Sequence, residues 1–232
     1  MQNLINRKLL PFWSLILGLA ICTSTSVMSI AYVMITVLVL FKSRLWQQIK
    51  QVLSNPYVAA SVCFYAVFVL SLIWTTAPFY DIWKMLLRVI GYLLAPLLLI
   101  AFQTDNCGKL LLRGFIIGAL LTAILSIISW IFNHHILYGI QDNTWVIFHG
   151  HILHNAFLAI ASCFMLWVAT SNISKATRIW SIIAYLILFV DILFIVNGRT
   201  GQVMLLVMNS FLLLYRFKLK GLFILFCATM VC

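Results

Sequence analysis

Residues 112–132 read LRGFIIGALLTAILSIISWIF, a stretch whose one charged side chain, Arg113, stands next to its start. A helix needs about 20 predominantly apolar residues to cross the hydrocarbon layer of a membrane. Eight runs of the chain come close to that length, and they lie roughly at Leu9–Thr25, Val27–Phe41, Tyr57–Trp74, Leu86–Phe102, Leu112–Phe132, Ile152–Thr170, Ile179–Val196 and Gln202–Tyr215. The sequence therefore predicts an all-α fold, a polytopic bundle of about eight transmembrane helices.

The composition supports a membrane protein and argues against a nucleic-acid partner. The 232 residues are 65% hydrophobic and 8% charged, whereas a soluble domain carries about 25% charged residues. The net charge of +11 comes from Lys and Arg in twos and threes between apolar runs, without the basic stripe or stacking motif of a nucleic-acid binder. The six cysteines are scattered without a CxxC pair, so they predict neither a disulfide framework nor a metal site.

The two ends of the chain carry further expectations. Arg7 and Lys8 precede the first apolar run without a small-residue cleavage site behind it, which favours an uncleaved first span. A ninth apolar run, Gly221–Cys232, would reach only about 18 Å as a helix. We therefore expect a single transmembrane domain over residues 1–232 with a truncated ninth span, the N-terminal portion of a longer protein.

The distribution of Lys and Arg predicts the direction of the spans. Loops on the cytoplasmic side of a membrane are enriched in these residues. With the N-terminus in the cytoplasm, twelve of the 15 Lys and Arg fall on the inner side, and the other three, Lys84, Arg88 and Arg199, fall on the outer side. Because these three break the charge rule, we expect them to bind an anionic, phosphate-bearing ligand on the outer face.

Arg199 stands in the short link Asn197–Gly201, which reads NGRTG. The two glycines are expected to allow a tight turn with positive φ. The arginine would then lie near the N-terminus of the next helix, where free N–H groups and the helix dipole favour an anion. An arginine can also meet a phosphate with two parallel hydrogen bonds. The alternative is an arginine that snorkels to lipid headgroups or neighbouring carbonyls.

Lys84 and Arg88 are four residues apart and share a helix face at the start of the fourth run, with Asp81 one turn earlier. One interpretation is a short ion-paired helix in which Asp81 pairs with Lys84. Arg88 lies deeper, so we expect it to face the interior of the bundle or a wet cavity.

All five histidines fall between His134 and His154. His151 and His154 are three residues apart, but the nearby sequence offers no Cys or Glu to complete a tetrahedral metal site, so we predict no metal and no cofactor. His154 with Asn155 is interpreted as a polar lining that donates hydrogen bonds to a ligand, or as a pair that packs against another span. His151 is the second ligand-binding candidate of this stretch.

Asp191 lies within the seventh apolar run, where a carboxylate is costly and needs a partner. The preferred partner is one of the outer cations, and the alternative is a role in proton relay.

The charge layout, the outer link GRTG at Gly198–Gly201 and the sixth run that opens on a His-rich polar stretch resemble the N-terminal half of the O-antigen ligase family. The resemblance implies a glycosyltransferase of the bacterial inner membrane that needs no metal. It would transfer a glycan from undecaprenyl pyrophosphate to the lipid A core on the periplasmic face. By the same resemblance Arg199 would hold the donor pyrophosphate, with Arg88 as a second cation and Lys84 beside it.

The catalytic histidine of this family lies in a periplasmic loop that follows the matched region, so we assign no catalytic residue here and expect it downstream of Cys232. Three alternatives stay open: an O-antigen polymerase or another lipid-linked glycan transferase, a transporter or flippase of an anionic lipid, and an inactive remnant of a ligase.

Overall fold

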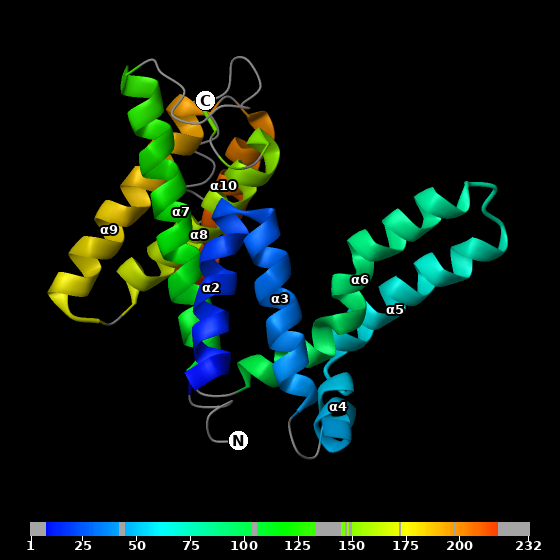
Figure 1. The fold of residues 1–232 in the computed structure, drawn as a ribbon. Coiled ribbons are helices and arrows are strands. Elements are labelled where there is room, and N and C mark those ends of the chain that lie inside the picture. Colours follow the sequence, from blue (N-terminus) through cyan, green and yellow to red (C-terminus); the bar gives the residue numbers. More distant parts are fainter. Residues whose placement is uncertain are drawn as a thin grey trace. The chain divides into compact units, whose positions relative to one another are not determined.

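The described part of the chain is mostly helical and contains no strand (Figure 1). The computed structural model describes residues 8–41, 45–103, 106–132, 145–146, 148, 150–171, 173–196 and 198–217. The elements are α2 (Leu10–Thr23), α3 (Thr25–Leu40), α4 (Leu45–Leu53), α5 (Pro56–Leu70), η2 (Ser71–Ile73), α6 (Phe79–Phe102), α7 (Cys107–Phe132), α8 (His151–Thr170), α9 (Lys175–Val190), η3 (Asp191–Ile195) and α10 (Arg199–Phe217). The predicted all-α class is confirmed.

In the described ranges, five helical segments are long and apolar enough to cross a membrane, which supports the predicted membrane bundle. They are Pro56–Ile73, Phe79–Phe102, Cys107–Phe132, His151–Thr170 and Lys175–Ile195. The first two expected spans form the shorter apolar helices α2 and α3, of 14 and 16 residues. The eighth forms α10, a more polar helix of 19 residues. The ninth run lies outside the described residues, and the number of spans stays a prediction.

The chain divides into two compact units. Unit 1 contains Met1–Leu17 and Ser26–Leu112, and unit 2 contains Gly18–Thr25 and Arg113–Cys232. In unit 1, α3 buries Ala31, Ile35 and Val39, which share a face because they follow one another at intervals of four residues. These side chains join a core with residues of α2, α4, α5 and α6.

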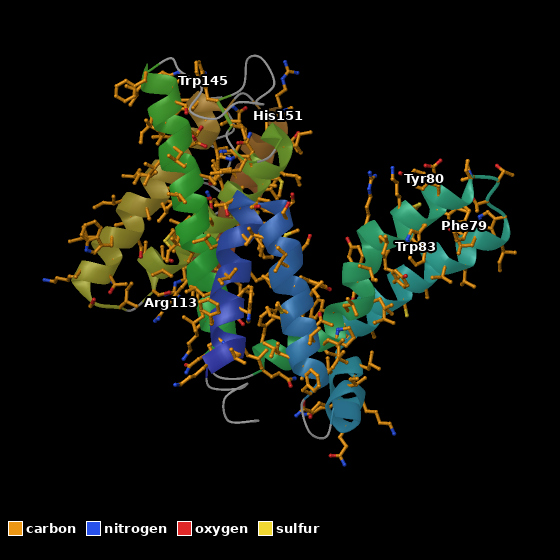
Figure 2. All side chains as sticks on the ribbon, in the orientation of Figure 1. Phe79, Tyr80, Trp83, Arg113, Trp145 and His151 are labelled. Carbon is orange, nitrogen blue, oxygen red and sulfur yellow. The ribbon has the colours of Figure 1, made fainter. Side chains whose placement is uncertain are left out.

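Helices α5 and α6 form an antiparallel hairpin in unit 1 (Figure 1). Asn55 caps α5, because its side chain accepts a hydrogen bond of 3.0 Å from the N–H of Tyr57. Figure 2 shows Phe79, Tyr80 and Trp83 toward the far end of the hairpin, where all three are exposed. Exposed aromatic side chains at the end of an apolar helix are typical of a membrane–water interface.

The segment with Lys50, which lies between the second and third expected spans, contains the helix α4. Its apolar side chains Ile49 and Val52 pack on the core of unit 1, whereas Lys50 and Gln51 are exposed. The segment is helical because its apolar residues recur at helical spacing and can be buried on one side. At nine residues, α4 is too short to be recognised in the sequence beside the longer apolar runs.

Unit 2 is built around α8, which packs against both α9 and α10. Small buried residues lie where the helices approach one another, namely Ala119 and Ala123 on α7, Ala159 and Ala161 on α8, and Ala184 on α9. Such residues let helix backbones come close in a membrane bundle. The buried leucines Leu158, Leu188 and Leu205 fill the remaining space between α8, α9 and α10.

Candidate functional site

The first turn of α8 places two of the predicted site residues at different depths. α8 begins at His151 after Gly150, whose carbonyl accepts the N–H of His154 at 3.1 Å. His151 is half-buried, whereas His154, nearly one turn further along, is only 3% exposed. A polar ring at this depth needs a hydrogen-bond partner within the protein.

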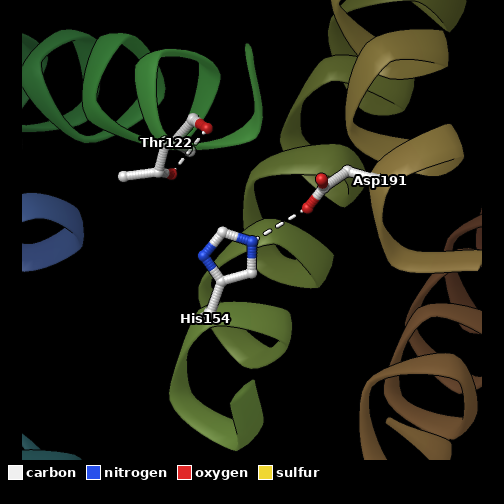
Figure 3. A network of polar contacts seen from close by, with 4 residues as sticks. Thr122, His154 and Asp191 are labelled. Atoms are coloured by element: carbon white, nitrogen blue, oxygen red, sulfur yellow. Dashed lines mark hydrogen bonds and ion pairs between the residues drawn. The ribbon is translucent and has the colours of Figure 1, made fainter. Parts of the chain in front are cut away.

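The partner of His154 is Asp191 at the start of η3 (Figure 3). Nε2 of His154 lies 2.8 Å from Oδ2 of Asp191, and the side chains of His154 and Asp191 are 2% and 0% exposed. An ionised carboxylate can only accept, so the hydrogen of this bond then sits on Nε2. The pair joins α8 to the end of α9 within the buried part of unit 2.

This pairing corrects the expectation that Asp191 binds an outer Lys or Arg. The carboxylate is closed off from solvent, and the adjacent helix α8 supplies an imidazole at bonding distance. A histidine can satisfy a buried carboxylate without bringing a permanent charge with it. The sequence did contain a signal for this pair. His154 stands near the beginning of one apolar run and Asp191 near the end of the next, so antiparallel spans would bring both residues toward the same side of the membrane. His154 thus packs against the end of α9 through this bond, and its contact with a ligand stays a prediction.

Asp191 also opens a π-helical segment, η3 (Asp191–Ile195). The N–H of Val196 bonds to the carbonyl of Asp191 at 3.0 Å, five residues back instead of four. Such short π segments are frequent at functional sites in otherwise α-helical spans. Here the segment ends the span and leads into the link before α10.

Arg199 is the first residue of α10, and its side chain is exposed. The expected helix N-terminus at this residue is therefore confirmed. The positive φ expected for the glycines is wrong, because neither Gly198 nor Gly201 has a φ in the left-handed region. Instead, both glycines allow the side chain of Asn155 to lie close to the backbone, because a Cβ on either one would overlap this side chain.

Asn155 occupies the space that the two glycines leave. It is completely buried, and neither its Oδ1 nor its Nδ2 has a hydrogen-bond partner in the part of the chain that the structure describes. Asp191 likewise has one unpaired oxygen, Oδ1. Leaving a buried polar group unpaired costs about 1–3 kcal/mol. The sequence predicted Asn155 only as part of a polar lining with His154, and the structure places it against the start of α10.

A stripe of hydroxyl groups on α7 was not anticipated. Thr122, Ser126 and Ser129 are all buried and follow one another at helical spacing on one side of α7. Thr122 donates to the carbonyl of Ala119 at 2.9 Å, whereas the hydroxyls of Ser126 and Ser129 have no partner within the described ranges. In the view of Figure 3, Thr122 lies on the side of the His154 ring away from Asp191.

The described arginines of unit 2 lie at its two ends. Arg216 donates to the carbonyl of Thr170 at 2.7 Å and Arg178 to that of Ser171 at 3.5 Å, both at the C-terminal end of α8. Figure 2 shows Arg113 and His151 at opposite ends of the unit. Gly198, next to Arg199, lies at the His151 end, because its Cβ would stand 3.9 Å from the ring of His151. Arg199 is thus far from the other arginines of the unit.

Lys84 and Arg88 lie on α6 in unit 1. Nζ of Lys84 is 4.2 Å from the ring centroid of Tyr80, and among the described residues no ion pair joins Lys84 to Asp81. Arg88 is exposed, so it does not lie in the interior of this unit. A pocket that combines these two cations with Arg199 stays a prediction.

His134, His135, His149 and Asp142 lie outside the described residues. Within the described ranges, no three His, Cys, Asp or Glu side chains come together as metal ligands. The described part of the site therefore consists of His151, His154, Asn155 and Asp191 with the start of α10.

This site combines an exposed guanidinium at a helix N-terminus with a buried wall that carries the hydrogen-bonded pair of His154 and Asp191 and the amide of Asn155, which has no partner among the described residues. Such an arrangement can bind an anion from the exposed side and offer it hydrogen bonds from the buried side. Comparison with known proteins found no matching family model, no matching curated protein and no matching solved structure.

Proposed function

We propose that the chain is a membrane glycosyltransferase of the O-antigen ligase type in the bacterial inner membrane. It would transfer a glycan from undecaprenyl pyrophosphate to the lipid A core on the periplasmic face. The proposal includes eight spans with a cytoplasmic N-terminus, so that the Arg199 end of unit 2 faces the periplasm. Its partners are the lipid-linked glycan, the lipid A core and the surrounding lipid.

The observation that carries the proposal is the position of Arg199. Its exposed side chain leaves the first turn of α10, at the end of unit 2 opposite to Arg178 and Arg216. The positive end of the helix dipole and the free N–H groups of the first turn add to the charge of the guanidinium. A diphosphate is an anion of suitable charge and geometry for such a place.

The chemistry of glycan transfer requires an anion site of this kind. A hydroxyl oxygen of the acceptor attacks the anomeric carbon, and the bond from this carbon to the diphosphate oxygen breaks. The hydroxyl proton passes to a base, which the family resemblance assigns to a loop after the matched region. Negative charge gathers on the leaving diphosphate, so a cation fixed beside it stabilises the transition state more than the ground state. Arg199 would supply this cation, with Arg88 and Lys84 as further candidates.

Binding of inorganic pyrophosphate to the purified chain tests the proposal. Arg199→Gln should weaken binding by about 10–100-fold, the equivalent of losing a hydrogen bond to a charged group. Arg199→Lys should fall between this variant and the native chain, because lysine keeps the charge and loses the paired geometry. Arg178→Gln is the matched control at the other end of unit 2 and should bind normally. Equal affinity of the native chain and Arg199→Gln would refute the proposal.

The acceptor distinguishes a ligase from a polymerase. In cells that carry the complete protein, loss of glycan from the lipid A core in the Arg199→Lys variant indicates a ligase. Glycan chains of reduced length on an otherwise normal core indicate a polymerase.

A transporter or flippase of an anionic lipid is a second candidate, favoured by the π-helical segment η3, which begins at the buried Asp191. Short π-helical segments are frequent at functional sites. Proteoliposomes with a fluorescent polyprenyl diphosphate separate the two functions. A transporter moves the lipid between leaflets without an acceptor, whereas a transferase leaves its distribution unchanged.

A further inference from the structure

Asn155 is the most unusual polar residue of unit 2. It is completely buried, yet among the described residues neither polar atom of its amide has a hydrogen-bond partner. A residue that served only to fill this space would be better replaced by an apolar side chain of similar size, because that change would remove two unpaired atoms. The amide is therefore retained at a cost in stability, which is typical of residues that serve function.

The amide faces the beginning of α10. Its Nδ2 lies against Gly198, the residue before α10, and would be 2.9 Å from a Cβ on Gly201 in the first turn. The N–H groups of Gly201 and Gln202 bond to the carbonyl of Gly198 at 3.0 and 3.3 Å. The preceding N–H groups have no partner within the helix, as at every helix N-terminus. A buried donor and the positive end of a helix thus point to the same place.

We propose that Asn155 is a ligand-contact residue of the anion site at the start of α10. This inference rests on the proposed function, in which Arg199 holds a diphosphate. Nδ2 of Asn155 donates a hydrogen bond to a phosphoryl oxygen of this ligand. Arg199 reaches the same ligand from the exposed side, and His151 stands at the rim beside Gly198.

The glycines are part of this arrangement. Any side chain at position 198 or 201 would occupy the space that Asn155 now fills. Gly198 belongs to the short connection between η3 and α10, and Gly201 to the first turn of α10, so Asn155 lies directly against the start of this helix.

The test uses the full chain in detergent and measures two properties, thermal unfolding and affinity for inorganic pyrophosphate. Asn155→Leu removes both unpaired atoms and keeps the size, so Tm should rise by about 2–4 °C while the affinity falls about tenfold. Asn155→Asp keeps the shape and adds a negative charge, so it should weaken binding more than the leucine does. A residue with a purely structural role would not produce this order.

Asn209 supplies the matched control. It is a largely buried asparagine in the later part of α10, with one bond of 3.2 Å to the hydroxyl of Tyr185 and an unpaired Oδ1. Asn209→Leu and Asn209→Asp should leave the affinity for pyrophosphate unchanged. Native affinity in both Asn155 variants would overturn the inference.

Further measurements distinguish a lipid headgroup from a free diphosphate as the ligand. They also distinguish a failure of the role of Asn155 from a failure of the proposed function. The same variants are measured in nanodiscs that contain a polyprenyl diphosphate lipid. Dependence on Asn155 for this lipid supports a headgroup ligand, and dependence for inorganic pyrophosphate alone supports a free diphosphate. Arg199→Gln with weakened binding and Asn155→Leu with native binding would refute only the role of Asn155. Native binding by Arg199→Gln would refute the proposed function itself.

Discussion

The buried pair of His154 and Asp191 shows how single residues organise this site. A carboxylate inside a membrane bundle is tolerated where another side chain satisfies it, and the imidazole of His154 does so at 2.8 Å. From the sequence, both residues could be recognised as costly and therefore as important. Their pairing could not be predicted, because it depends on how α8 turns its first residues toward the end of α9. The same holds for the glycines at 198 and 201, whose neighbour Asn155 is distant in sequence.

Removing one member of the pair should cost far more than replacing both. His154→Leu leaves a buried carboxylate without its donor, which should destabilise the fold by about 3–5 kcal/mol. Asp191→Leu leaves an unpaired imidazole N–H and should cost about 1–3 kcal/mol. The double variant removes both polar groups and should be close to the native protein or more stable. Thermal unfolding of the four proteins in detergent checks this order, and simple additivity of the two single losses would contradict it.

At the scale of elements, the long helices were predictable and the irregular ones were not. An apolar run of 20 residues can satisfy its backbone in a membrane only as a helix, so α7 and α8 follow from composition alone. Helix α4 is short and amphipathic, and its helical state depends on the core of unit 1 that covers Ile49 and Val52. The π segment η3 adds one residue to a helical turn, which leaves no pattern in the sequence that differs from an α-helix.

The packing of α4 leads to a prediction for two adjacent residues. Val52 is 2% exposed in the core of unit 1, whereas Gln51 is exposed. Val52→Asp would bury an unpaired carboxylate and should lower the free energy of unfolding by several kcal/mol, roughly 3 or more. Gln51→Asp should change it by no more than about 0.5 kcal/mol. Thermal unfolding in the same detergent compares the two, and equal stabilities would mean that α4 does not pack on this core.

At the scale of the whole molecule, the separation of charge links the sequence to a direction in the membrane. The loops predict that Arg113, Arg178 and Arg216 share one side and that Arg199 lies on the other. Within unit 2 the contacts of Arg178, Arg216 and Gly198 agree with that separation, because the first two lie at the C-terminal end of α8 and the third at its N-terminal end. Which end faces the cytoplasm depends on the membrane itself, so it requires an experiment.

Site-directed labelling determines this direction. In a background with all six cysteines replaced, Thr200→Cys and Ala176→Cys place single thiols at exposed positions near the two ends of unit 2. Inner loops hold the positive charges, so a membrane-impermeant maleimide should label Thr200→Cys in intact spheroplasts. It should label Ala176→Cys only after the membrane is permeabilised, which also serves as the control for reactivity. The opposite pattern would place Arg199 in the cytoplasm, away from any periplasmic diphosphate, and glycan transfer at this site would have to be abandoned.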